Sequence, residues 1–334
     1  MSEEEPLLPT GTPADVPQPP APHPDPTQRG DTEVKTILLR LLDAMEANEA
    51  GVLLNEDPEC LHDFRIAVRR TRSALGQVKG VFPESAVRRF ATRFAWLGQI
   101  TGEPRDFDVY LLGFDELKAG LPPAFQDDIE PLRGFLQRHA GLAHAGMTRQ
   151  IRSLKYRKLL ADWRKFLASP CPKRPSAPHA LTPIQTIADQ RIWKLFRRVL
   201  KEGRAIRPGT PAENIHELRK TCKKLRYLLE FFRDLYPPEE INRPIKQLKR
   251  LQDYLGDFQD VHTRMDMLRR ISHEMREDPS VPAEAILALG VLLAALDRQR
   301  ETLREAFPER FEPFATTGNR TRFRGLFRQG ESGA

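Results

Sequence analysis

From Thr32 onward, apolar residues recur along the chain with the three-to-four-residue period of α-helices. Gly and Pro fall between these periodic segments, β-branched residues are sparse, and alternating strand-like runs are missing from the pattern. The pattern therefore predicts an all-α protein. The predicted helices cover 32–48, 61–80, 84–101, a pair within 106–167, 184–202, 212–234, 239–255 and 260–307, the last with a break near Pro279.

Two Pro-rich segments interrupt this helical pattern. Residues 1–30 contain nine prolines, and few of their apolar residues are periodic, which is typical of a disordered tail. The segment SPCPKRPSAPHALTP at 169–183 indicates a linker between two halves of similar length. The predicted organisation is a disordered Pro-rich acidic tail (1–30), a first helical repeat (31–168), the linker (169–183), a second helical repeat (184–315) and a basic, flexible C-terminal tail (316–334).

One motif occurs in both halves at a constant offset of 154 residues. LHDFRIAVRRTR at 61–72 returns as IHELRKTCKKLR at 215–226, and the offset still holds, ungapped, at Asp106 and Asp260. Matching over this length indicates an internal duplication. We therefore expect two four-helix bundles related by a pseudo-two-fold axis.

Each copy of the motif places its cations on one side of a helix. At about 100° per residue, the cationic side chains fall within about 80° of one another, and the apolar side chains lie opposite. We call these two rows the first stripe and the second stripe. The first stripe consists of His62, Arg65, Arg69 and Arg72, and the second of His216, Arg219, Lys223 and Arg226.

The charge balance supports an anionic partner. Lys and Arg number 53 against 46 Asp and Glu, giving a net charge of +7, and the first 30 residues alone carry about −4. A basic body suits nucleic acid, a membrane surface or a phosphate polymer. Like charges at helical spacing destabilise a helix unless an anion compensates them. A row of cations fits a linear chain of negative groups better than one compact phosphate, because Arg presents a planar fork of donors.

Several other classes of function lack their sequence signals. Three cysteines without a CxxC pattern predict free thiols in a reducing compartment, and no signal peptide or membrane span is evident, so we expect a soluble, cytoplasmic protein. The histidines lack metal-ligand spacing and no cofactor motif is found, so neither metal nor cofactor is expected. Asp106 and Asp260 give one acid per half, which favours a supporting role over catalysis.

The doubled pattern H-x-x-R-x-x-x-[RK]-[RK]-x-R, each copy followed by G-x-x-x-D (GEPRD at 102–106, GDFQD at 256–260), resembles the CHAD family, the conserved histidine α-helical domains. The resemblance covers about 32–312 and implies two four-helix bundles around a basic central cavity. It also implies binding of inorganic polyphosphate and location on polyphosphate granules. The chain has no E-x-E-x-K motif and no room for the triphosphate tunnel domain of many relatives, so a stand-alone domain without that activity is expected. The resemblance assigns phosphate binding to both stripes, with Arg70 and Lys224 at their edges. Lys220 is included with them, although its counterpart in the first copy is the apolar Ile66.

Two alternatives to non-catalytic polyphosphate binding remain open. A nucleic-acid binder would use the same cations, although aromatic residues are not interleaved with the stripes and no helix-turn-helix or RNA-binding signature is found. A phosphoryl-transfer enzyme could use the two histidines, although the residues that would complete such a mechanism are missing.

Further basic residues that could widen the site are Arg89, Arg243, Lys246, Arg250, Arg152 and Arg304.

Overall fold

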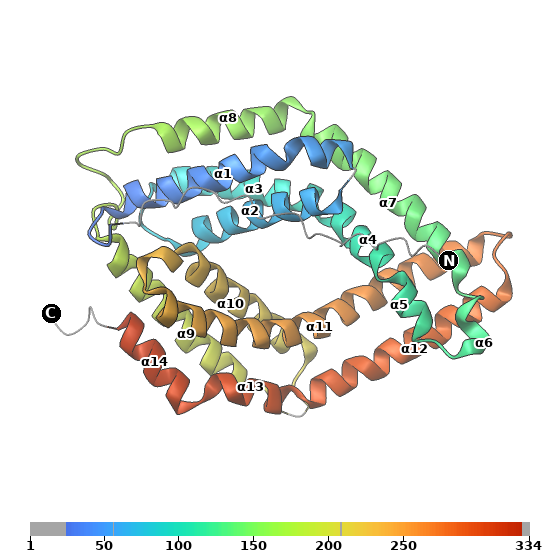
Figure 1. Cartoon of the computed structure of the whole chain (residues 1–334). Helices are drawn as coiled ribbons and strands as arrows, with labels where there is room; N and C mark the ends of the chain where they lie inside the picture. The colour runs from blue at the N-terminus through green and yellow to red at the C-terminus, as the bar shows by residue number, and fades with distance from the viewer. Residues whose placement is uncertain (1–24, 56, 208, 329–334) are drawn as a thin grey trace, which may run out of the picture.

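The computed structural model describes residues 25–55, 57–207 and 209–328, and every regular element in these ranges is a helix (Figure 1). The all-α prediction is confirmed. The elements of the first half are α1 (Gly30–Leu54), α2 (Pro58–Gln77), α3 (Glu84–Ile100), α4 (Gly102–Leu112), α5 (Phe114–Ala119), α6 (Pro123–Gln126), α7 (Glu130–Ile151) and α8 (Leu154–Ala168). Those of the second half are α9 (Ile184–Ala205), α10 (Ala212–Phe231), the 3₁₀ turn η1 (Arg233–Leu235), α11 (Pro238–Glu277), α12 (Ala283–Glu305), α13 (Phe307–Ala315) and α14 (Thr317–Phe327).

Helix boundaries in the two halves follow the 154-residue offset of the motif. Helices α9, α10 and α11 begin 154 residues after α1, α2 and α3, respectively. Helix α10 also ends 154 residues after α2, so that both motif helices contain 20 residues. The two stripes therefore start from closely matched local structures.

The halves diverge after the third helix of each. Helix α11 is continuous over 40 residues, so the expected break between 255 and 260 is wrong. The matching part of the first half is divided at Thr101 into α3 and α4. Pro104 explains the division, because it has no N–H to donate to the carbonyl of Ile100. The residue at the matching position of α11 is Phe258, which can donate.

The apolar core consists of two clusters, and each contains residues of both halves. One cluster joins α1, α2, α3 and α8 to α9, α10, the first part of α11, α13 and α14. The other joins α4, α5 and the first part of α7 to the later part of α11 and α12. The long helices α7 and α11 run from one cluster to the other (Figure 1). The boundary between the cores thus differs from the boundary between the sequence halves.

The C-terminal segment differs from the expected flexible tail. Residues 317–327 form α14, which packs against α9. Phe323 and Phe327 are buried, and the ring of Phe323 stacks on that of Phe196 at 3.8 Å between centroids. The prediction of a flexible tail is wrong for this stretch because the two aromatic side chains, four residues apart, share one helix face that the core covers. The last six residues lie outside the described part.

The predicted N-terminal tail lies mostly outside the described residues, since only its end from Asp25 onward is described. That end is held by the linker. Arg29 Nη2 donates to the carbonyl of Pro172 at 2.8 Å, and the backbone N–H of Gly30 donates to the carbonyl of Thr182 at 2.9 Å. The linker in turn donates from the His179 N–H to the carbonyl of Gly80 in the turn after α2. These bonds fix the linker against the first half.

Candidate functional site

The helices that carry the two stripes, α2 and α10, contact each other directly. Each buries its apolar side in the core, with Phe64 of α2 and Leu218 of α10 fully buried. Across the contact, the guanidinium of Arg69 lies 5.4 Å from the ring centre of Tyr227, within the range of a cation–π interaction. The amphipathic pattern of each helix thus leaves its cationic side outside the apolar core.

The charges of the two stripes act on one another at Lys223. Burial and then the positive charges of Arg219, Arg69 and Arg65 together lower the pKa of the Lys223 ammonium to about 8, while the charge of Asp260 opposes them. Two of these three arginines belong to the first stripe. Because charge–charge effects weaken with distance, cations of both stripes must lie near Lys223. The fold therefore brings the predicted stripes together.

Arg65 and Arg219 occupy matching, partly buried positions. Arg65 Nη1 donates to Thr101 Oγ1 at 3.1 Å and to the carbonyl of Gly98 at 3.3 Å, whereas Arg219 Nη2 lies 3.7 Å from Asp260 Oδ1. Burial lowers the pKa of both guanidinium groups. The Nε of Arg219 is buried, and in the described part of the chain it has no hydrogen-bond partner. This donor could be satisfied by an external acceptor.

The two aspartates of the G-x-x-x-D elements lie close enough to interact. Loss of surrounding water raises the pKa of Asp106, the charge of Arg65 opposes this rise, and the charge of Asp260 adds to it. Asp106 therefore stands near Arg65 in the first half as Asp260 stands near Arg219 in the second. This placement suits carboxylates that support the neighbouring arginines.

The two histidines have partners at matching positions but opposite hydrogen-bonding roles. Arg105 Nη2 lies 3.3 Å from His62 Nδ1, and because Arg can only donate, this Nδ1 accepts. His216 Nδ1 contacts Gln259 Oε1, whose amide nitrogen donates to Thr263 Oγ1 at 3.0 Å. His216 therefore donates through Nδ1. In the neutral rings, the Nε2 of His62 holds a proton while the Nε2 of His216 does not.

A single carboxylate joins the end of the second stripe to Arg70, at the edge of the first. Glu230 accepts from Arg226 Nε at 2.6 Å with one oxygen and from Arg70 Nη2 at 3.3 Å with the other. Arg226 Nη1 also donates to Gln252 Oε1 at 3.2 Å. Glu230 thus links α2 to α10 and neutralises part of the positive charge at this end.

The remaining predicted residues are placed less uniformly. Lys220 is exposed and pairs with Glu217 at 2.5 Å, and Lys224 is half-buried. Arg304 pairs with Glu301 and donates to the carbonyl of Thr210. The side chains of the other five secondary candidates are exposed, and nothing that the structure describes brings them into contact with the stripes: Arg89, Arg243, Lys246, Arg250 and Arg152.

The neighbours of the stripes were missed by sequence reasoning. Tyr227, Gln252 and Gln259 are uncharged and gave no signal of their own. Arg105 lies inside the GEPRD element, and the constant offset pairs it with Gln259. Comparing the positions next to each motif at that offset could therefore have identified the histidine partners.

Metal ligation and membrane spanning find no support in the described ranges. His, Cys, Asp and Glu side chains there form no group of three or more that could hold a metal ion. None of the helices described combines the length and the apolar character needed to cross a bilayer.

Comparison with known proteins identifies the family. No curated protein matches the sequence. The crystal structure of the CHAD domain from the plant Ricinus communis is similar with a TM-score of 0.70 and 24% identity, over 88% of this chain and 97% of that one. PptA from Streptomyces chartreusis is similar with a TM-score of 0.64 and 17% identity, over 85% and 100% of the two chains. The family model of the CHAD domain matches residues 36–269, and the chain therefore belongs to the CHAD domain family.

Proposed function

We propose that the protein binds inorganic polyphosphate along the two stripes, without cleaving it, and associates through this binding with polyphosphate granules. The observation that carries the proposal is the contact of α2 with α10, which gathers cations of both stripes around the partly buried Lys223 and, after burial, helps to lower its pKa to about 8. A fold that gathers unbalanced, partly buried cations is stabilised by an anion that enters between them. Membership of the CHAD family points to the same ligand.

The shape of the site favours a linear polyanion. Each stripe extends over eleven residues, or about 15 Å of helix. Arginines can bind phosphate oxygens with two parallel donors, and the buried Nε of Arg219 still needs an acceptor. A phosphate chain supplies such acceptors at every unit along its length.

The proposal includes a pseudo-two-fold arrangement of the halves around a basic central cavity. The shared starting offset of three helix pairs supports an internal duplication. The contact between α2 and α10 would place the duplicated stripes next to the axis. One phosphate chain could then contact both halves at once.

A competition titration tests the ligand class. Labelled long-chain polyphosphate is bound to the protein and displaced with unlabelled polyphosphate, duplex DNA or single-stranded RNA at fixed ionic strength. We expect polyphosphate to displace the label at far lower phosphate concentration than either nucleic acid. Equal or better displacement by RNA or DNA would replace the proposal with nucleic-acid binding.

Two further measurements define the mode of binding. Incubation followed by gel analysis should leave the polyphosphate chain length unchanged, with and without added divalent cations, whereas shortening would indicate an enzyme. If about six phosphates are engaged, the logarithm of the affinity should fall with the logarithm of the salt concentration with a slope of roughly −4. A salt-independent affinity would mean that the stripes are not the contact surface.

A further inference from the structure

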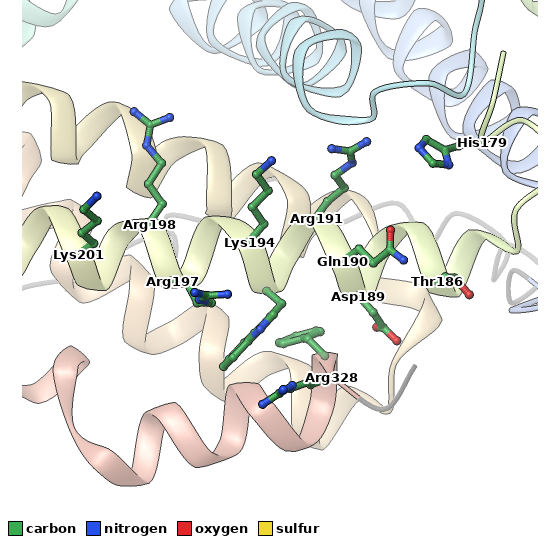
Figure 2. Close-up of a pocket in the computed structure, with 12 residues that line it drawn as sticks. His179, Thr186, Asp189, Gln190, Arg191, Lys194, Arg197, Arg198, Lys201 and Arg328 are labelled. Carbon is green, nitrogen blue, oxygen red and sulfur yellow. The ribbon is translucent and has the colours of Figure 1, made fainter. Parts of the chain in front are cut away.

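Helix α9 carries a third row of cations with the same spacing as the stripes. Arg191, Lys194, Arg198 and Lys201 follow one another at intervals of three, four and three residues, as do the four members of each stripe. Figure 2 shows these four side chains projecting from the same side of α9. We call them the α9 row. Their charged groups extend over about 15 Å of helix.

The α9 row borders a cavity of about 760 Å³, also lined by Arg197, Arg328 and His179 (Figure 2). One acid, Asp189, lines this cavity beside six Lys and Arg side chains. Asp189 already accepts hydrogen bonds from Tyr236 Oη at 2.7 Å and Gln185 Nε2 at 3.1 Å, and burial raises the pKa of its carboxyl. The cavity therefore has a strongly positive lining.

Most of these cations lack an internal counter-charge. Arg198 pairs with Glu202 at 2.5 Å. In contrast, Lys194, Arg197 and Lys201 form no ion pair with any carboxylate that the structure describes. Arg191 Nη2 donates to the carbonyl of Lys79 at 2.9 Å, which fixes its guanidinium beside the turn after α2. The row thus combines one positioned cation with free lysines.

The duplication does not account for the α9 row. The matching positions on α1 are Ile37, Arg40, Ala44 and Ala47, so the first half keeps only one of the four cations. The row also lies on a different helix from the stripes, which are carried by α2 and α10. The α9 row is therefore specific to the second half, and its unpaired positive charge could be neutralised by an anionic ligand.

We propose that the α9 row and its cavity form a second binding site for linear inorganic phosphate chains, separate from the stripes. This inference rests on the proposed function, because the ligand class is taken from the identical spacing of cations. The site has fewer partly buried cations than the stripes and should therefore be the weaker of the two. A chain long enough to occupy both sites would gain affinity through multivalency.

Calorimetric titration with tripolyphosphate at low salt tests the second site. We expect the wild-type protein to bind at two sites, and Lys194→Glu with Lys201→Glu to lose the weaker one while keeping the stronger. The loss should be at least roughly tenfold in affinity, the scale of one charge-assisted contact. The control is Lys158→Glu with Lys165→Glu on α8, which reverses two exposed lysines at the same seven-residue spacing and should leave both sites intact.

Each outcome separates this inference from the proposed function. If tripolyphosphate binds once and only stripe substitutions such as Arg65→Ala abolish it, the second site does not exist and the proposed function stands. If the α9 variant keeps both sites but loses binding of single-stranded RNA, the row is a nucleic-acid surface and the inference is overturned. If wild-type protein binds no phosphate chain, both proposals fail. Circular dichroism of each variant confirms that it is folded.

Discussion

The helices α2 and α10 begin and end at matching positions, yet they differ in the charged residues that they carry and in how these are paired. The stripe of α2 contains three arginines, and position 76, which matches Glu230, is Gly76. In α10, Lys223 replaces the arginine at the third position, and Glu230 pairs with Arg226. The two matched helices therefore carry a strongly cationic row and a partly neutralised one, respectively.

The exchange of Arg69 for Lys223 is the most consequential of these differences. A guanidinium keeps its charge at any physiological pH, whereas a lysine among other cations can release its proton. Burial and the surrounding arginines bring Lys223 close to that point. The charge of the second stripe can therefore change with pH, whereas that of the first is held by arginines.

Reversing one charge in each stripe should have the largest effect. Arg69→Glu with Lys223→Glu removes two cations and adds two anions where the stripes meet. We expect polyphosphate affinity to fall on the order of a thousandfold or more, because two charge-assisted contacts are replaced by repulsion. The measurement is a fluorescence binding titration near physiological salt.

The Lys158→Glu and Lys165→Glu pair on α8 makes the same change in net charge and serves as the control. Near-equal losses in the two double variants would show that overall charge, and not the stripes, determines binding.

Removing the matched arginines one at a time tests whether both halves contact one ligand. Arg65→Ala and Arg219→Ala should each weaken binding by about 1.5–3 kcal/mol, since each loses one charge-assisted contact. Calorimetry measures the affinities, and thermal melting checks that the fold survives. If one variant bound polyphosphate with normal affinity and the other did not bind it, the site would belong to a single half.

The pH dependence should distinguish Lys223 from Arg69. The ordinary pKa of a lysine is near 10.5, and that of Lys223 is lowered to about 8. An anion binds the charged form, so the contribution of Lys223 is complete below that pH and declines as the pH rises through it. Between pH 7 and 9.5, affinity should fall by up to about tenfold.

Lys223→Arg is the matched variant for this prediction, because it keeps the charge throughout the range. Its binding profile should be nearly flat. A decline as steep as in the wild type would point to a different titrating group.

Removing the carboxylate between the stripes should have the smallest effect and the opposite sign. Glu230→Gln keeps a hydrogen-bonding amide but frees Arg226 and Arg70 from their counter-charge. We expect affinity to rise roughly three- to tenfold, the scale of one nearby charge at intermediate dielectric. Glu217→Gln, whose partner Lys220 lies off the stripe, should change affinity less. Weaker binding in Glu230→Gln would mean that Glu230 is needed to position the arginines.

The sequence alone determined the local features of this protein. Periodic spacing within each segment predicts the helices and their amphipathic sides, because a helix of fixed geometry places residues of a given spacing on one face. The two stripes follow from the same spacing, and the 154-residue offset follows from comparing the two motifs. Even the division between α3 and α4 has a local cause in Pro104. The α9 row could also have been predicted from the sequence, since its spacing is the same as that of the stripes. It was not singled out because it does not begin with a histidine.

Which of these helix faces contact one another depends on packing between distant segments. The contact of α2 with α10, the effect of Arg65 and Arg69 on Lys223, and the bond of Arg70 to Glu230 join residues more than a hundred positions apart. The same holds for α14. Its basic sequence is typical of a flexible tail, but the ring of Phe323 stacks on that of Phe196 and holds the helix against the core. The burial of a side chain and its distance from other charges depend on packing between distant segments. The residue pattern within one helix does not show which other helix will pack against it.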